Sequence, residues 1–300
     1  MTVLRRPRKA TVMRSLPKLD KAPGTAGKPA RTLLPALLSA GRPLVMGVLN
    51  VTPDSFSDGG QFLEPTTAIA RAAQMMRQGA DILDIGAEST RPYGGALPVS
   101  AEDEKARLAP VLPDVVKLGL PVSIDTIKAS LAAWAIDVGA TIVNDVGGLQ
   151  GDADMATLVA KRGVPVIVMH NRESADADID IVSDAINFFS RSLEIAAQAG
   201  IARECIVLDP GVGFGKTPEQ SITCLARFGE FTRFGLPLLV GASRKRFINT
   251  ISSSPPDGRI GGSISAHVLA VQKGAAIVRV HDVAETVQAL RVSAAIEAAR

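Results

Sequence analysis

The sequence has few cysteines, few aromatic residues and no long apolar run. Of its 300 residues, two are cysteines (Cys205 and Cys224) and 4% are aromatic. These cysteines form neither a metal-ligand cluster nor a C-x-x-C pair, so we expect a reducing, cytoplasmic setting. No apolar run approaches the ~20 residues that a membrane helix requires, and we expect no membrane partner. Apolar residues still make up 46% of the chain, which excludes a collagen-like chain, a wholly disordered chain and a disulfide-stapled miniprotein.

Several catalytic signatures are also missing. The chain has no serine–histidine–acid spacing, no helix with metal-ligand spacing and no Walker loop ending in Gly-Lys-Ser/Thr. The segment GVGFGK at 211–216 superficially resembles a phosphate loop, but its spacing is wrong. We interpret it as a glycine-rich turn that leaves a strand.

Positive charge is concentrated at the start of the chain. The formal net charge is only +3. Residues 1–43 hold ten basic groups and one acid, Asp20, and so carry +9, which leaves the other 257 residues at −6. Prolines and glycines interrupt this stretch, so we expect 1–43 to be a disordered basic extension and 44–300 to be one domain. The acidic body has no basic patch interleaved with aromatics, which argues against a nucleic-acid partner.

From residue 44 onward, short apolar runs alternate with longer stretches of helical period. Runs that are apolar almost throughout are typical of a parallel sheet covered by helices. Seven glycines (79, 119, 139, 163, 200, 235 and 274) each stand between a helix and the next strand, where a left-handed helix cap belongs. We predict strands at 45–50, 82–86, 121–125, 141–145, 164–170, 205–209, 236–241 and 276–280, and helices at 66–78, 101–118, 127–138, 152–162, 179–199, 218–228, 258–273 and 283–299.

Eight strand–helix units favour an α/β fold of the (β/α)8, or TIM-barrel, type, whose typical size is ~250 residues. A doubly wound open sheet is the alternative, and the spacing alone does not exclude it. Such a sheet would carry a glycine-rich dinucleotide turn after its first strand. The sequence NVTPD stands there instead, at 50–54, so we expect the barrel.

Polar and ionisable residues follow the predicted strands at one end. In a barrel the active site is built from the carboxyl ends of the strands and the loops after them. Each of the eight units contributes such a group there, whereas the opposite strand ends offer mostly glycine, proline and aliphatic residues. These groups are Asn50, Glu88, Thr90, Arg91, Asp125, Asn144, His170, Asp209, Ser243, Arg244, Lys245, Arg279 and His281.

The kinds of residue narrow the chemistry. Asp125, Asn144 and Asp209 suit the hydrogen-bonding edge of a flat heterocycle, because carboxylates sharing one cavity need donors to offset their burial. Lys245 adds a charged donor, and Arg279 adds a planar cation that stacks or clamps a phosphate. Arg91, Asn50 and His281 extend the anion-binding side. The residues alone therefore predict a polar heterocycle joined to a phosphorylated group.

Seven segments together resemble one family, the dihydropteroate synthases of the folate pathway. The likeness runs in order over 44–299, one segment at each strand end, and the first segment is highly specific. The segments are MGVLNVTPDSFSDGG at 46–60, ESTRP at 88–92, SIDT at 123–126, VNDV at 143–146, LDPGVGFGK at 208–216, GASRK at 241–245 and RVHD at 279–282.

The resemblance implies a transferase that condenses 6-hydroxymethyl-7,8-dihydropterin diphosphate with p-aminobenzoate, giving dihydropteroate and diphosphate with the help of Mg²⁺. It implies that Asp125, Asp209, Lys245 and Arg279 are catalytic and hold the pterin together with Asn144, Met169 and Phe214. It assigns the diphosphate to Asn50, Arg91, Arg279 and His281, with Asn50 as a Mg²⁺ contact, and p-aminobenzoate to Thr90, Pro92 and Ser243. Loops 52–60 and 92–95 would cover the substrates, sulfonamides would inhibit, and the protein would be a homodimer.

The sequence departs from the family pattern in two places. His170 is followed by Asn171 and Arg172, whereas many members have methionine after the histidine, and this difference puts one wall of the expected pterin site in doubt. In the second place, Ala87 replaces a commoner glycine. Two alternatives share the barrel: a folate:corrinoid methyltransferase, which has no use for a diphosphate site, and a non-catalytic pterin-binding paralogue. A nucleic-acid-binding protein that uses the basic extension is a third.

Overall fold

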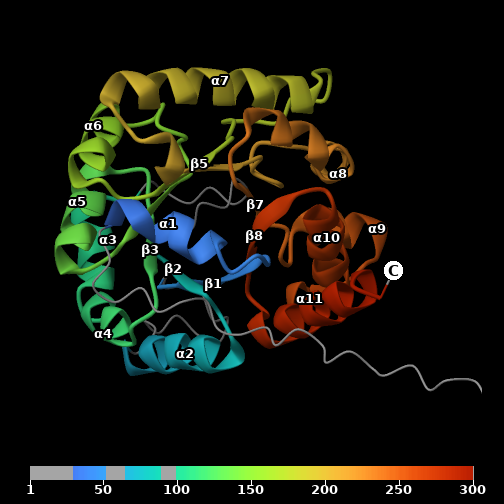
Figure 1. Cartoon of the computed structure of the whole chain (residues 1–300), viewed down its shortest axis with the longest axis horizontal. Helices are drawn as coiled ribbons and strands as arrows, with labels where there is room; N and C mark the ends of the chain where they lie inside the picture. Colours follow the sequence, from blue (N-terminus) through green and yellow to red (C-terminus); the bar gives the residue numbers. More distant parts are fainter. Residues whose placement is uncertain (1–29, 52–64, 89–98, 300) are drawn as a thin grey trace, which may run out of the picture.

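The apolar runs form eight parallel strands that close into a barrel in chain order (Figure 1). The computed structural model describes residues 30–51, 65–88 and 99–299. The predicted barrel is therefore confirmed, and the open sheet is excluded. The strands are β1 (Leu44–Asn50), β2 (Ile82–Gly86), β3 (Val122–Asp125), β4 (Ile142–Asp145), β5 (Val166–Met169), β6 (Ile206–Asp209), β7 (Leu238–Val240) and β8 (Ala275–Val280).

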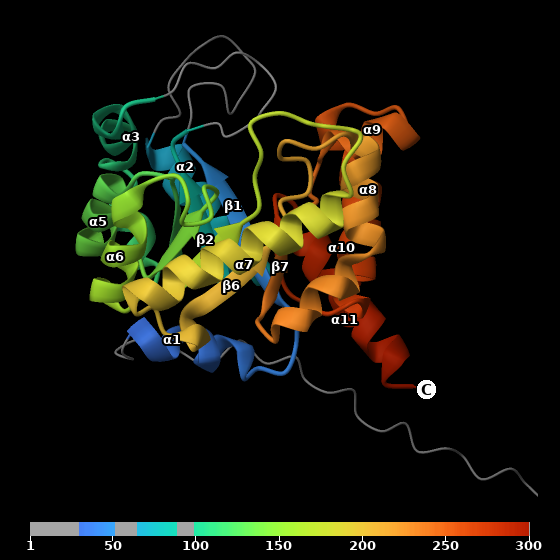
Figure 2. The same ribbon diagram turned by 90° about the horizontal axis from the view of Figure 1, so that it is seen from above.

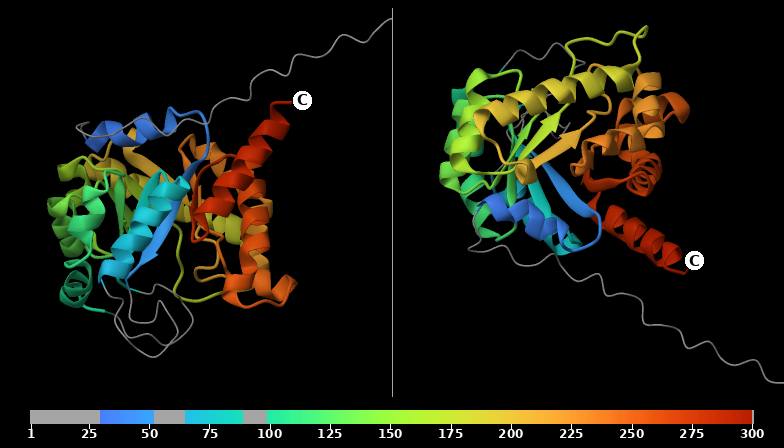
Figure 3. Two further views of the ribbon diagram at one scale, coloured as in Figure 1. Left: turned by 90° about the horizontal axis from the view of Figure 1, so that it is seen from below. Right: turned by 45° about the horizontal axis from the view of Figure 1, so that its top comes forward.

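Helices surround the strands, as two further views show (Figure 3). No helix within the described ranges is long and apolar enough to span a membrane. The helices are α1 (Ala30–Leu38), α2 (Pro65–Gln78), α3 (Ala101–Leu108), α4 (Leu112–Lys117), α5 (Ala129–Val138), α6 (Ala153–Arg162), α7 (Ile181–Ala199), α8 (Pro218–Ala226), α9 (Arg246–Ile251), α10 (Ile260–Gln272) and α11 (Val283–Glu297).

Local sequence accounts for most helix boundaries. All seven glycines predicted to follow helices have positive φ, from 61° at Gly235 to 125° at Gly139, the conformation in which a side chain is penalised. The single helix predicted at 101–118 is wrong, since it divides into α3 and α4. Pro110 lies in the break and Pro113 in the first turn of α4; each lacks the N–H that a continuous helix would use. Helix α9 was not predicted.

Two separate apolar cores hold the barrel together. The larger one packs the outward side chains of the strands against the surrounding helices. The smaller one lies inside the barrel, and the strand residues in it are Leu44, Met46, Ile82, Ile142, Ile167, Val207, Leu239 and Ile277. This inner layer forms a floor beneath the carboxyl ends of the strands.

Helix α1 covers the amino-terminal end of this floor. Leu33, Leu34 and Leu37 are at most 4% exposed and belong to the inner core. Figure 2 shows α1 at the end of the barrel opposite α9. The expectation of disorder up to residue 43 is therefore wrong for residues 30–43, because burial of three leucines offsets the hydrogen bond that Pro35 cannot donate. Residues 1–29 lie outside the described residues.

Candidate active site

In β2, β4, β6 and β8 the inward side chains change from apolar to polar within one step of the strand period. Successive residues of a strand face opposite sides, so the residue two positions after a floor residue also points into the barrel. Asp84 follows Ile82 in this way, Asn144 follows Ile142, Asp209 follows Val207 and Arg279 follows Ile277. The strand period therefore gathers these four polar side chains in the layer above the floor.

Arg279 is held between two carboxylates at the centre of this layer. Its Nε donates to Asp84 Oδ2 at 2.6 Å, and its Nη2 donates to Asp125 Oδ2 at 2.7 Å. Asn144 Nδ2 lies 3.3 Å from Asp84 Oδ2. The second oxygen of Asp125, Oδ1, is buried and has no hydrogen-bond partner within the described part of the chain. A buried carboxylate oxygen of this kind needs a donor, and a ligand N–H can supply one.

Burial and neighbouring charges shift the protonation of these groups. Burial raises the pKa of Asp125 to about 7; Arg279 opposes this rise, and the charge of Asp84 adds to it. Burial likewise raises the pKa of Asp209. The nearby carboxylates raise the pKa of Arg279 against the effect of burial, so its guanidinium stays charged. The layer therefore contains a permanent cation beside a carboxylate that titrates near neutral pH.

Lys245 and Phe214 stand next to this layer and contact each other. Lys245 Nζ lies 3.9 Å from the centroid of the Phe214 ring, a cation–π geometry. Burial lowers the pKa of Lys245 to about 7, and the charge of Arg279 lowers it further. Phe214 also packs with Met169 and Val146 in a small apolar cluster. Asp209 Oδ1 accepts from the backbone N–H of Gly211 at 2.8 Å, which fixes the carboxylate.

Ser243 and His281 meet on another side of the barrel mouth. Ser243 Oγ lies 2.9 Å from His281 Nδ1 and accepts from the His281 backbone N–H at 3.2 Å. Burial, followed by the charges of Arg279 and Arg244, lowers the pKa of His281 to about 3, so its imidazole is neutral at physiological pH. Arg244, between Ser243 and Lys245, has φ +57°, and Asp282 binds its guanidinium. The turn at Arg244 therefore separates the directions of its two polar neighbours, Ser243 and Lys245.

The structure brings together most of the residues predicted from the sequence. Asn50 ends β1, is partly buried and makes no side-chain hydrogen bond to the rest of the described chain. The described residues contain no group of three or more His, Cys, Asp or Glu side chains that could hold a metal ion. Thr90, Arg91 and Pro92, and the predicted covering loops at 52–60 and 92–95, lie outside the described residues.

The sequence departs from the family pattern just after β5, beginning at the residue that follows His170. His170 turns outward, with Nε2 3.0 Å from Asp184 Oδ2 on α7 and its ring against the edge of Phe188. Met169 is buried with Phe214. Asn171 and Arg172 follow Met169 by two and three residues, and the backbone of Arg172 packs against Gly215. His170 itself, one of the polar strand-end residues, does not join the central layer.

Sequence reasoning missed Asp84, which is fully buried and pairs with Arg279. The strand period of the sequence does indicate that Asp84 points into the barrel. A carboxylate stands in the otherwise apolar run ILDIG of β2, two residues after Ile82, just as Asn144 stands two residues after Ile142. Asp84 lies inside its strand, whereas the site residues predicted from the sequence stand at or after the strand ends.

Comparisons with known proteins agree with this geometry. A family model described as a pterin-binding enzyme matches residues 46–281. Over 241 residues the chain is 44% identical to the dihydropteroate synthase of Bacillus subtilis, covering 80% of this chain and 84% of that protein. It also resembles the solved dihydropteroate synthase of Clostridium difficile in the presence of pteroic acid (TM-score 0.81, 46% identity, 85% of this chain and 97% of that one). The Yersinia pestis synthase in a sulfonamide drug complex is similar (TM-score 0.80, 41% identity, 87% and 96%).

Proposed function

Because this chain belongs to the pterin-binding enzyme family and has dihydropteroate synthase activity, we propose that the barrel mouth described above is its active site. There the dihydropterin diphosphate and p-aminobenzoate condense to dihydropteroate and diphosphate. The observation that carries this assignment is the charged layer around Arg279. It offers a carboxylate oxygen without a partner among the described residues, a charged guanidinium and, next to them, the ammonium group of Lys245.

The pterin ring lies against this layer. Asp125 and Asp209 accept from the N–H groups of the ring, and Asn144 and Lys245 bind the remaining polar edge. The ammonium group of Lys245 makes no hydrogen bond to the rest of the described chain, so its three donors are available to a ligand. Met169 and Phe214 supply apolar walls, and the Arg279 guanidinium covers one face of the ring.

The diphosphate lies toward Asn50, Arg279 and His281, and the family resemblance adds Arg91, which lies outside the described residues. Mg²⁺ commonly keeps several waters and takes only one or two protein oxygens together with substrate phosphates. The amide oxygen of Asn50, which has no partner among the described residues, fits such a site. When bound, Mg²⁺ neutralises charge on the diphosphate oxygens. The neutral imidazole of His281 adds a hydrogen bond without adding charge.

The reaction is a substitution at the pterin methylene carbon. The leaving diphosphate develops negative charge, which the preorganised Arg279 cation stabilises better than water does. Asp125 and Asp209 lie near the ring and favour cationic character at the methylene carbon. The arylamine of p-aminobenzoate is already nucleophilic, so no strong general base is required. Ser243 binds the benzoate in this proposal, and the family resemblance adds Thr90, Pro92 and the covering loops 52–60 and 92–95, all of which lie outside the described residues.

The direct test is product formation by the purified chain. Incubation with the pterin diphosphate, p-aminobenzoate and Mg²⁺ should release diphosphate and yield dihydropteroate. A sulfonamide should slow the reaction competitively with p-aminobenzoate, since a sulfonamide complex is known for the Yersinia pestis relative. A folded protein that binds the pterin but releases no diphosphate would instead favour a non-catalytic pterin-binding role.

We also propose that the chain functions in the cytoplasm as a homodimer. Three large apolar side chains on α10 and α11, which pack against each other, are 49–60% exposed: Leu269, Val292 and Ile296. Exposed apolar groups clustered on neighbouring helices are typical of a surface that a second copy covers. Replacing Val292 and Ile296 with lysine should convert a dimer into a monomer in light scattering. Retention of the dimer by this variant would contradict the assignment of this surface.

A further inference from the structure

The glycine-rich segment 211–216 packs directly against the backbone that follows β5. Its three glycines have φ of 63°, 82° and 53°. A Cβ at Gly211 would lie 2.0 Å from the carbonyl oxygen of His170, and one at Gly215 would lie 2.2 Å from that of Arg172. Any side chain at either position would therefore displace the backbone. The glycines bring two loops into contact at the barrel mouth.

Lys216 ends this segment with its ammonium group inside the protein. Lys216 is 1% exposed, and its Nζ donates to the carbonyl oxygens of Phe214 at 3.0 Å and His170 at 3.3 Å. One carbonyl belongs to its own loop and the other to the residue after β5, so the ammonium group joins the two loops. Burying an ammonium group is costly, and an apolar side chain of similar length would avoid that cost.

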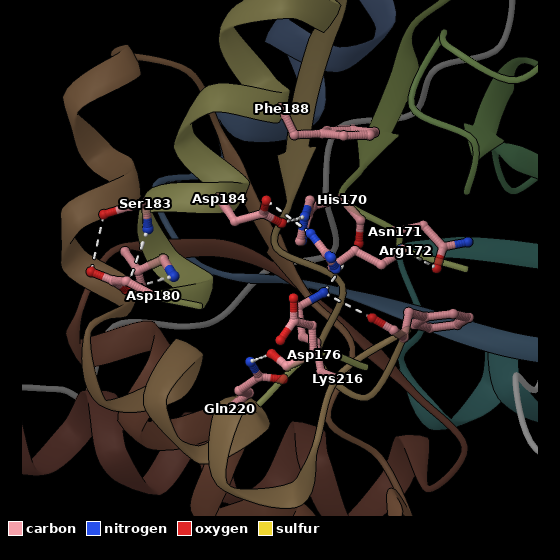
Figure 4. A network of polar contacts seen from close by, with 12 residues as sticks. His170, Asn171, Arg172, Asp176, Asp180, Ser183, Asp184, Phe188, Lys216 and Gln220 are labelled. Carbon is pink, nitrogen blue, oxygen red and sulfur yellow. Dashed lines mark hydrogen bonds and ion pairs between the residues drawn. The ribbon is translucent and has the colours of Figure 1, made fainter. Parts of the chain in front are cut away.

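The residues around Lys216 hold the second loop in place (Figure 4). Arg172 Nη1 donates to Asp184 Oδ1 at 2.9 Å, on the first turn of α7. Gln220, in the first turn of α8, donates from Nε2 to the carbonyl oxygen of Asp176 at 2.6 Å. The loop after β5, to which Lys216 donates a hydrogen bond, is therefore held in place by contacts with α7 and α8.

We infer that Lys216 is a positioning residue for the pterin site. Its ammonium group ties the β6–α8 loop to the end of β5 and so keeps the Phe214 ring beneath Lys245. Lys216 binds the carbonyl of Phe214 itself, and the Phe214 ring lies 3.9 Å from Lys245 Nζ. This inference rests on the assignment of Phe214 and Lys245 to the pterin site.

The charge of Lys216 has a second effect on the same neighbour. Four charged groups face Lys245. Arg279 and Lys216 lower its pKa, whereas Asp209 and Asp125 raise it, and burial is the largest cause of the net lowering to about 7. Loss of the Lys216 charge should therefore raise the pKa of Lys245. A purely structural residue would not change that pKa in a defined direction.

Two substitutions separate the two effects, and an exposed lysine is the control. Lys216→Met removes both the hydrogen bonds and the charge, whereas Lys216→Gln removes the charge but keeps an amide donor. Lys161→Met changes an exposed lysine on α6. The kinetic constants for both substrates are measured for the four proteins, with kcat/KM for the pterin diphosphate as a function of pH. Thermal unfolding establishes which variants are folded.

Lys216→Met should raise KM for the pterin diphosphate by about tenfold or more, as expected from losing a hydrogen bond to a charged group, with a smaller change for p-aminobenzoate. In both Lys216 variants the alkaline limb, where Lys245 loses its proton, should move to higher pH. Lys161→Met should match the unmodified protein. If Lys216→Met does not fold, the position of the alkaline limb in the pH profile of Lys216→Gln tests the inference.

An alkaline limb at the original pH in Lys216→Gln would overturn the inference. Equal increases in KM for both substrates in Lys216→Met would do the same, because they would indicate general loosening of the barrel mouth. If the unmodified chain itself forms no dihydropteroate, the proposed function fails and not the role of Lys216. The pH limb of the unmodified chain serves as the reference for both variants.

Discussion

Asp84→Asn should weaken the active site and also shift its pH dependence. The substitution keeps the shape of the side chain and removes one of the two carboxylates that hold Arg279. The bond from Arg279 Nε to Asp84 is 2.6 Å long and fully buried on the carboxylate side. Hydrogen bonds to charged groups contribute about 1.5–3 kcal/mol, so kcat/KM for the pterin diphosphate should fall by roughly 10- to 150-fold.

The direction of the pH shift follows from the neighbouring carboxylate. Asp125 has a pKa of about 7, and the negative charge of Asp84 contributes to that rise. Asp125 must be ionised to accept from the pterin, so kcat/KM falls as the pH drops through this pKa. In Asp84→Asn the repulsion is gone and the pKa of Asp125 decreases. The acid limb of the profile should therefore move to lower pH.

The assay is kcat/KM for the pterin diphosphate between pH 5.5 and 9, with Asp114→Asn as the matched control. Asp114 forms an exposed ion pair with Lys117, in which the two side chains are 50% and 75% exposed, and exposed pairs contribute little. An acid limb of Asp84→Asn that stays in place or moves to higher pH would refute the electrostatic argument. A normal kcat/KM would refute the role of Asp84 in holding Arg279.

Three further predictions concern separate parts of the molecule. Arg279→Ala and Lys245→Ala should each lower turnover by at least ~10-fold, equivalent to about 1.4 kcal/mol, and near-normal rates in a discontinuous assay would contradict the site assignment. Burial lowers the pKa of His267 to about 4, so protonation of this residue favours the unfolded chain between pH 6.5 and pH 4. The free energy of unfolding should therefore fall by about 3 kcal/mol over that range, and urea unfolding of His267→Gln should not show this decrease. Leu34→Ala should lower the free energy of unfolding by about 2–5 kcal/mol, whereas Ile251→Ala, at a position that is 69% exposed on α9, should leave the urea midpoint nearly unchanged.

The sequence predicts the repeating part of the fold well because each unit carries its own local signals. All eight strands form within two or three residues of the predicted boundaries, and each of the seven predicted glycine caps has positive φ. Helix boundaries fail where proline acts, as between α3 and α4, because two prolines there remove donors that helical period alone does not register. Local chemistry decides all these features, so a single sequence is sufficient.

Tertiary contacts decide the features that were missed. Helix α1 has a composition that predicts disorder, and it is ordered by the contacts of Leu33, Leu34 and Leu37 with the barrel floor. Asp84 acquires its role from Arg279, which lies 195 residues later in the chain. The partner in either contact cannot be identified within a window of ten or twenty residues, although the strand period of β2 does mark the position of Asp84. The outward direction of His170 likewise depends on α7, through Asp184 and Phe188.

The floor and the site are linked by the same strand period, and this explains why the polar groups lie where they do. Ile82, Ile142, Val207 and Ile277 close the barrel beneath the polar layer, so water cannot reach Arg279 and its carboxylates from below. In that dry setting an unpaired charge is costly, and each charge in the layer must meet a partner or a ligand. The protein meets this demand only in part, since Asp125 Oδ1 has no partner within the described residues. In the proposed site this oxygen would accept a hydrogen bond from an N–H group of the pterin, which would complete the pairing that the barrel leaves open.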